Sequence, residues 1–146
     1  MSKLRVGIIG LGGIARAHGD AIATLDNVEV IAVADLFEDK RQQFMERYGV
    51  SKGYVSHVEL LQDEEVDAVA ITLGHQLHHK LTVDSCNAGK HVLVEKPMAI
   101  SLEQCDDMIV AAALQHTVSR RKHLQLLLGW QWPDRALGRR HPSWRH

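Results

Sequence analysis

A glycine-rich turn near the N-terminus constrains the fold of this chain more than any other feature. Residues 10–15 read Gly-Leu-Gly-Gly-Ile-Ala, follow the apolar run 4–9 and precede a segment with helical spacing. Glycine permits the tight turn and lets the backbone approach a pyrophosphate, and the N–H groups at the helix start attract phosphates. Alone, the pattern would also suit a turn that merely needs glycine. The candidate phosphate-binding residues are Gly10, Gly12, Gly13, Ile14 and Ala15.

Apolar runs typical of buried strands alternate with helical patterns along most of the chain. The expected strands are residues 4–9, 28–34, 54–55, 66–73 and 91–94. The expected helices are residues 14–25, 37–48, 56–61, 75–88 and 101–112. The first helix is indicated by apolar residues at helical spacing, which are Ile14, Ala17, Ala21 and Leu25. The second helix places Phe37, Phe44 and Tyr48 on one face. With right-handed crossovers, this alternation predicts an α/β fold with a doubly wound parallel sheet.

An acidic residue stands at the end of the second expected strand. Asp35 lies 20 residues beyond Ala15, where a carboxylate would accept hydrogen bonds from an adenosine ribose. The alternative interpretation is a helix cap or a solvated turn acid. Because a carboxylate repels a 2′-phosphate, Asp35 favours NAD over NADP, and the neighbouring Lys40 and Arg41 soften that preference.

A second informative element is the sequence Glu95-Lys96-Pro97 at the end of the fifth expected strand. Charged residues there suit the sheet edge at which doubly wound folds bind ligands. A lysine at that edge can donate a proton or a hydrogen bond to a substrate oxygen. Pro97 fixes the local backbone and admits a cis peptide bond. The alternative is a charged loop that a turn proline closes.

About residues 3–113 resemble the N-terminal domain of the glucose–fructose oxidoreductase / inositol dehydrogenase / MocA family. The segments that carry the resemblance are residues 6–15, Asp35 and residues 88–97, Ala-Gly-Lys-His-Val-Leu-Val-Glu-Lys-Pro. The resemblance implies a Rossmann-type domain that binds NAD(P). It also implies that Lys96 is catalytic, contacting cofactor and substrate during hydride transfer between nicotinamide C4 and a hydroxyl-bearing carbon, often of a sugar or polyol. Glu95 and Pro97 would then shape the nicotinamide pocket.

The loop after the fourth expected strand departs from the family pattern. Members commonly show Thr-Pro-Asn followed by a histidine, whereas residues 73–78 read Leu-Gly-His-Gln-Leu-His. His78 matches the family histidine and His75 replaces the asparagine, so we expect Leu73, His75 and His78 near the cofactor. His75, His78 and His79 also have the spacing of metal ligands on a helix, but no carboxylate or cysteine joins them at a recognisable spacing. We expect no metal site.

The overall charge of −1 averages two unlike pieces. Residues 1–113 hold ten Lys and Arg against seventeen Asp and Glu, and residues 114–146 hold seven against one, with all three tryptophans. We expect a cofactor domain in residues 1–113 and a basic tail in residues 114–146 that is foreign to the family, as a frameshift or truncation would produce. In that tail, residues 124–128 are a candidate sixth strand. The family's second domain, which supplies the substrate pocket, is expected to be absent.

Composition narrows the class of protein and its location. The near-neutral charge and the lack of a recognisable groove-reading fold argue against nucleic-acid or membrane binding. Cys86 and Cys105 suit reduced apolar positions, so we expect a cytoplasmic protein. The expected partner is a nicotinamide dinucleotide, with a small-molecule substrate only if a second domain is supplied. We therefore expect an oxidoreductase present as its cofactor domain and inactive alone. The alternative is a non-catalytic nucleotide-binding or redox-sensing module.

Overall fold

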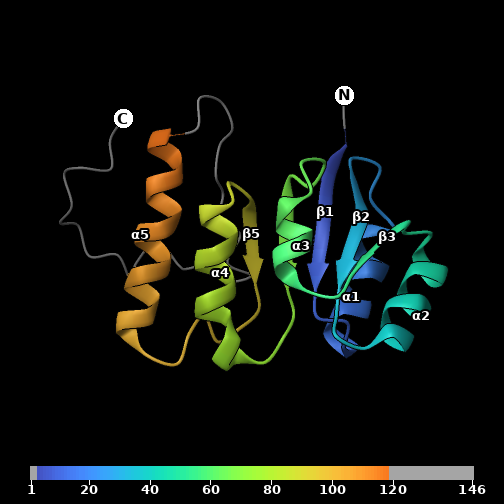
Figure 1. Cartoon of the computed structure of the whole chain (residues 1–146), viewed down its shortest axis with the longest axis horizontal. Coiled ribbons are helices and arrows are strands. Elements are labelled where there is room, and N and C mark those ends of the chain that lie inside the picture. The colour runs from blue at the N-terminus through green and yellow to red at the C-terminus, as the bar shows by residue number, and fades with distance from the viewer. Residues whose placement is uncertain (1–2, 119–146) are drawn as a thin grey trace.

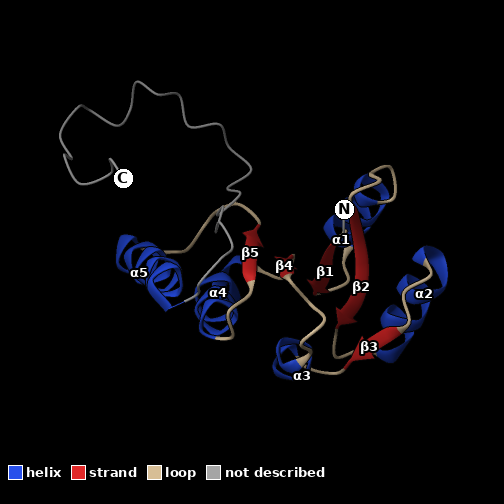
Figure 2. Ribbon diagram, turned by 90° about the horizontal axis from the view of Figure 1, so that it is seen from above, coloured by secondary structure: helices blue, strands red, loops and turns tan. Residues whose placement is uncertain are grey.

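Five parallel strands form one sheet within residues 3–118, the part of the chain that the computed structural model describes. The strands are β1 Leu4–Ile9, β2 Val28–Ala34, β3 Lys52–Tyr54, β4 Ala68–Ile71 and β5 His91–Val94. Their order across the sheet is β3-β2-β1-β4-β5. Figure 1 shows β3 and β5 on opposite sides of β1, and Figure 2 labels all five strands. β1 pairs with both β2 and β4. The chain adds β2 and β3 on one side of β1 and then adds β4 and β5 on the other side, so the strand order reverses between β1 and β4. The expected doubly wound parallel sheet is confirmed.

Helices cover both faces of the sheet. They are α1 Gly13–Ile22, α2 Glu38–Tyr48, α3 His57–Gln62, α4 His78–Asn87 and α5 Leu102–Val118, with a short 3₁₀ helix at His75–Leu77. Figure 2 shows α1 and α2 on one face and α3, α4 and α5 on the other. Residues of β1 alternate between the two cores: Ile8 packs with Phe44 of α2, and Ile9 packs with Leu81 of α4. The described helices include none long and apolar enough to cross a membrane.

The structure corrects the limits of several expected elements, among them the first helix, expected at 14–25, which ends at Ile22. Residues 75–88 do not form one helix, because a 3₁₀ turn precedes α4, which begins at His78. The strand expected at 66–73 is shortened to β4. The third strand begins at Lys52 instead of Tyr54, and it pairs only with the end of β2. Pairing with a neighbouring strand, which apolar runs do not reveal, sets the limits of the two strands.

The apolar spacing in the first helix predicted the wrong buried face. Ile14 is 51% exposed and Leu25 is 48% exposed, while the buried residues of α1 are Ala15 and Gly19. A Cβ atom on Gly19 would lie 2.7 Å from the ring of Tyr48. The buried face of α1 therefore carries small side chains, because α2 packs closely against α1 at this point.

Phe37 also differs from the expectation. It is the N-cap of α2 and is 62% exposed, so it does not share the buried face. Phe44 and Tyr48 do pack together, with ring centroids 4.4 Å apart. A helix that begins one residue later than expected places Phe37 before its first turn.

The ends of several helices agree with the sequence. Ser56 and Glu59 form the expected capping box at the start of α3. Gly49 ends α2 in the left-handed region, with φ +68°. At the far end of the domain, α5 continues to Val118, beyond the residue where the pattern was expected to change. The candidate strand at 124–128 lies outside the described residues.

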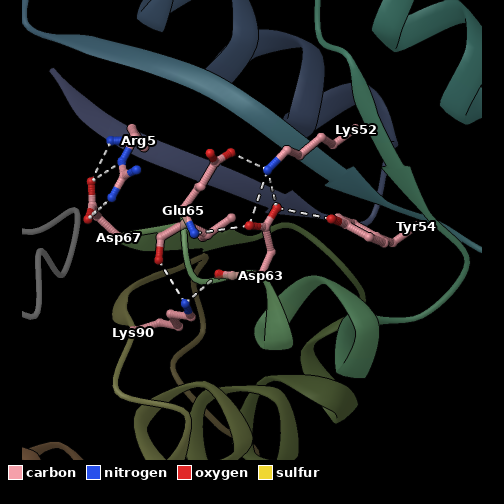
Figure 3. Close-up of polar contacts among 8 residues, drawn as sticks. Arg5, Lys52, Tyr54, Asp63, Glu65, Asp67 and Lys90 are labelled. Carbon is pink, nitrogen blue, oxygen red and sulfur yellow. Dashed lines mark hydrogen bonds and ion pairs between the residues drawn. The ribbon is translucent and has the colours of Figure 1, made fainter.

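A polar cluster at the amino ends of the strands centres on the buried carboxylate of Asp63 (Figure 3). Lys52 Nζ lies 2.9 Å from it, and the Tyr54 hydroxyl and the Glu65 N–H donate to it at 3.0 Å. Burial alone would raise the pKa of Asp63, but these three donors outweigh burial and lower the pKa below its ordinary value. These contacts hold the segment before β4, which contains Asp63, against β3.

Two further cations bind the same segment to β1 and β5. Lys90, which is 8% exposed, donates to the main-chain oxygens of Asp63 at 2.7 Å and Val66 at 2.8 Å. Burial lowers the pKa of Lys90. Arg5 of β1 forms a two-pronged ion pair with Asp67, with both distances 3.0 Å. Because this cluster lies at the edge opposite the carboxyl ends of the strands, its role is to stabilise the sheet.

Replacing Asp63 with asparagine should make folding stability less dependent on pH. A folded-state pKa below the unfolded value of about 3.9 stabilises the protein above that pH, and the gain is lost as the pH falls through the folded pKa. We expect Asp63→Asn to lower the free energy of unfolding by about 1.5–3 kcal/mol at neutral pH. The difference from wild type should shrink in acid.

Urea unfolding across the pH range measures this effect. Asp26→Asn, at an exposed turn position, is the matched control and should change little. An equal loss for Asp63→Asn at neutral and acidic pH would show that the ionised carboxylate is not what stabilises the cluster.

Candidate functional site

The candidate site lies where the carboxyl ends of β1 and β4 meet, at the point where the strand order reverses. Gly10 follows β1 with φ +90°, a conformation that L side chains rarely adopt. A Cβ atom there would also lie 2.4 Å from Cγ of Leu73, in the loop after β4. The Gly10 N–H donates to Ala34 O at 2.8 Å, and the Thr72 hydroxyl donates to Gly10 O. Glycine is therefore required at this position by both conformation and space.

The next two glycines face open space. A Cβ atom on Gly12 or Gly13 would meet no atom of the described residues within 4 Å. Gly12 is the N-cap of α1 and offers no side chain to its first turn. Ile14 is half exposed at the helix start, whereas Ala15 is fully buried and lets α1 pack against the sheet. The turn thus leaves room for a phosphate beside a helix N-terminus.

Asp35 contacts the glycine turn directly. The Leu11 N–H donates to Asp35 Oδ2 at 2.8 Å, and the Phe37 N–H donates to Asp35 Oδ1 at 3.0 Å. The carboxylate therefore fixes the turn after β1 to the end of β2. Each carboxylate oxygen has a further lone pair, so Asp35 can also accept a ribose hydroxyl, as the sequence predicts.

The two basic residues near Asp35 have different surroundings. The Arg41 guanidinium donates to Asp35 O at 2.7 Å and so braces the start of α2. Lys40 Nζ lies 4.7 Å above the ring of Phe37. A cavity of about 520 Å³ separates the glycine turn from α2, and Lys40 and Gly12 are among its lining residues. Arg16 and Arg47 line the same cavity, so three basic residues surround the space beside the turn.

The Glu-Lys-Pro turn follows β5 at the same edge. The peptide bond between Lys96 and Pro97 is cis, as the sequence allowed. Glu95 Oε1 lies 2.7 Å from His18 Nε2 of α1, and the Glu95 N–H donates to Ile71 O at 3.3 Å. Lys96 is exposed, and its side chain makes no hydrogen bond or ion pair within residues 3–118. Its ammonium group is available to a bound molecule.

His78 is buried beneath two loops. It is 1% exposed, its Nδ1 lies 2.7 Å from Pro97 O, and its Nε2 lies 3.0 Å from Leu73 O. The resemblance placed His78 near the cofactor, and a direct hydrogen bond from His78 to a cofactor would require one of these contacts to break. The histidine therefore joins the loop after β4 to the loop after β5.

The other two histidines of this segment point elsewhere. His75 is exposed at the start of the 3₁₀ helix, at the site edge. His79 Nε2 lies 3.2 Å from Asp107 of α5. In the part of the chain that the structure describes, no three metal-ligating side chains gather into a group. The histidine spacing thus reflects three separate environments.

The sequence did not single out His18, although it contacts Glu95. The two residues are 77 positions apart, and α1 and β5 are separated by several intervening elements. No motif or spacing links them. Only the folded sheet, which brings the turn after β5 over α1, reveals the pair.

A parallel sheet with a glycine turn at its reversal point and an acid at the end of the neighbouring strand defines a dinucleotide-binding domain of the Rossmann class. The family described as oxidoreductases with an NAD-binding Rossmann fold matches residues 4–123. The chain therefore belongs to the glucose–fructose oxidoreductase / inositol dehydrogenase / MocA family, as its motifs indicated.

The chain is similar to dehydrogenases and to a ketoreductase. Myo-inositol 2-dehydrogenase of Thermotoga maritima is 36% identical over 106 residues, which are 73% of this chain and 32% of that protein. Scyllo-inositol dehydrogenase of Lactobacillus casei, solved with NAD(H) and scyllo-inositol, superposes with a TM-score of 0.74 at 25% identity, covering 80% of this chain and 34% of that one. A 3-ketoreductase of Actinomadura kijaniata, solved with NADP, gives 0.74 at 31% identity, with coverages of 78% and 36%. This chain spans about a third of each relative's length.

Proposed function

We propose that this chain is the cofactor-binding part of an oxidoreductase that moves hydride between nicotinamide C4 and a hydroxyl-bearing carbon of a sugar or polyol. The observation that carries the proposal is the open glycine turn that Asp35 fixes at the reversal point of the sheet. Relatives named for inositols support the polyol class. The dinucleotide would supply the carbon that accepts or donates hydride.

Residues of this chain would hold the two halves of the dinucleotide differently. The N–H groups after Gly12 would bind the phosphates, since the space in front of that turn is open. Asp35 would accept hydrogen bonds from the adenosine ribose, which favours NAD over NADP. The loops that contain Leu73, His75 and Glu95 would border the nicotinamide.

Lys96 is the residue that we propose to act on the substrate. Its exposed ammonium group lies on the turn after β5, beside the other loops of the site. There it would donate a hydrogen bond to the substrate oxygen, and would give or take the proton as that oxygen changes between hydroxyl and carbonyl. This role makes Lys96 a catalytic residue in the complete site.

We expect the chain by itself to bind cofactor with little or no turnover. Hydride transfer needs the substrate carbon about 3–3.5 Å from the nicotinamide. Within the described residues, Lys96 is exposed on the turn after β5 and not enclosed with a substrate. The test is to incubate purified chain with NAD and myo-inositol or scyllo-inositol and to follow reduced nicotinamide by absorbance. Steady turnover that Lys96→Met abolishes would refute the expectation of inactivity while supporting the assigned chemistry.

A second candidate is a non-catalytic nucleotide-binding or redox-sensing module. The observation that favours it is that the described domain brings Asp35 and the open glycine turn together, whereas Lys96 is exposed. Lys96→Met separates the two functions. It should leave a sensing function intact, but it should abolish turnover in any assembly that catalyses hydride transfer.

We also propose a cytoplasmic location, which is supported by Cys86 and Cys105, because both are free thiols.

The C-terminal residues are proposed to depart from the family, as a frameshift would cause. Since α5 runs to Val118 and the family match to residue 123, the departing part would be shorter than residues 114–146. The other two reading frames of the coding DNA after this point test the idea, because a frameshift would leave family-like sequence in one of them.

A further inference from the structure

Two histidines from different helices hold the residues on either side of Lys96. We infer that His18 and His78 are positioning residues that fix the Glu-Lys-Pro turn and so shape the nicotinamide half of the cofactor site. His18 contacts Glu95 and His78 contacts Pro97, so Lys96 lies between two anchored neighbours. The inference rests on the proposed function, since it concerns how the same site is organised.

The contact between His18 and Glu95 ties the turn to the helix of the glycine turn. His18 Nε2 and Glu95 Oε1 are 2.7 Å apart, and the two side chains are only 23% and 29% exposed. A charge-assisted hydrogen bond that is partly shielded from water is stronger than one at the surface. Because His18 lies on α1, which Gly12 caps, the phosphate site and the turn after β5 share one rigid element.

The contacts of His78 tie the turn to the loop after β4. Both ring nitrogens face main-chain oxygens, of Pro97 at 2.7 Å and of Leu73 at 3.0 Å. Leu73 in turn packs against Gly10. A continuous set of contacts therefore runs from the glycine turn through Leu73 and His78 to Pro97.

This arrangement divides the site into two parts that respond to different substitutions. Asp35 and the glycine turn act on the adenosine and phosphate groups, and neither touches His18 or His78 in the hydrogen bonds of the described residues. The histidine-held turn acts on the nicotinamide. Loss of a histidine should therefore weaken binding of NAD but not of ADP-ribose, which has the same adenosine and phosphates and lacks nicotinamide.

Calorimetric titration of the full chain with NAD and with ADP-ribose tests the inference. His18→Leu removes a contact to a carboxylate, and His78→Leu removes two contacts to main-chain oxygens. Each variant should weaken NAD binding about tenfold and should change ADP-ribose binding less than about twofold. His18→Gln and His78→Asn place an amide nitrogen near the donor position and should restore most of the NAD affinity. His79→Leu, on the same helix as His78 but paired with Asp107, is the matched control and should bind both ligands normally.

Each outcome decides a different point. Equal weakening of both ligands by the leucine variants, or no weakening of either, overturns the positioning role while the nucleotide site stands. A wild-type chain that binds neither ligand overturns the proposed function, and the inference with it. Thermal unfolding of every variant accompanies the titrations. Should His78→Leu fail to fold, His18→Leu beside His18→Gln supplies the same comparison of loss and rescue.

Discussion

Replacing Gly12 with valine should weaken NAD binding at least about 30-fold, equivalent to about 2 kcal/mol, and leave the fold intact. The valine side chain would occupy the space in front of the turn, where we place the pyrophosphate. It would meet nothing in the described protein, because a Cβ atom on Gly12 has no neighbour within 4 Å. The backbone of Gly12, with φ −86° and ψ −165°, is also open to any L residue. The free energy of unfolding should therefore fall by no more than about 1 kcal/mol, the cost of a poorer N-cap.

Titration calorimetry and urea unfolding on the same preparation measure the two effects together. Ala17→Val, on the exposed side of α1, controls for added bulk on this helix and should alter neither quantity much. Wild-type affinity in Gly12→Val would mean that the turn does not face the phosphates. A large loss of stability would mean that this glycine serves the fold alone.

Replacing Gly10 with alanine, unlike replacing Gly12, should mainly affect the fold and should lower the free energy of unfolding by about 2–5 kcal/mol. A left-handed conformation costs an L residue about 1–2 kcal/mol, and forcing an extra methyl into packed surroundings adds about 1–3 kcal/mol. At Gly10 the added methyl would lie 2.4 Å from Leu73 Cγ and 3.2 Å from the Leu73 backbone nitrogen. NAD binding should be lost as well, because the loops after β1 and β4 would be pushed apart.

A double-mutant cycle separates the two causes of this destabilisation. Leu73→Ala in the Gly10→Ala background should recover the packing cost but not the conformational cost. The measurement is the free energy of unfolding of the four proteins by urea. Full recovery would contradict the conformational argument, and no recovery would contradict the predicted clash with the Leu73 side chain.

Local patterns predicted much of this domain. The doubly wound parallel sheet follows from alternating apolar runs and helical segments, because parallel strands joined by right-handed crossovers have few other arrangements. Gly10, Gly12 and Asp35 were identified because the turn and the acid follow adjacent strands at a fixed separation. The structure adds the Leu11 N–H bond to Asp35, which joins the two features directly.

Contacts between distant residues could not be predicted. The helical spacing of α1 indicated Ile14 and Leu25, yet Ala15 and Gly19 are buried because only small side chains permit the close approach of α2. Leu25 instead lines an apolar groove of about 490 Å³ over β1, β4 and β5. The apolar side chain of Leu25 therefore borders this groove and is not part of a buried helix face. Periodicity reports that a face is apolar, but it does not report what that face contacts.

The same limit applies to the histidines of the site. The sequence placed His78 near the cofactor, and the fold buries it against the main-chain oxygens of Leu73 and Pro97. His18 was not identified at all, since its partner Glu95 follows a strand formed much later in the chain. Both contacts arise where three loops meet at one edge of the sheet, which a local pattern does not encode.

Titration of the purified chain with NAD and with NADP tests the central claim most directly. The account predicts saturable binding of NAD at a single site, with NADP weaker by about tenfold because the carboxylate of Asp35 repels a 2′-phosphate. Asp35→Ala should weaken NAD and narrow the difference between the two cofactors. If neither dinucleotide binds at millimolar concentration, the glycine turn and Asp35 are structural features of the fold and the assigned cofactor site is wrong.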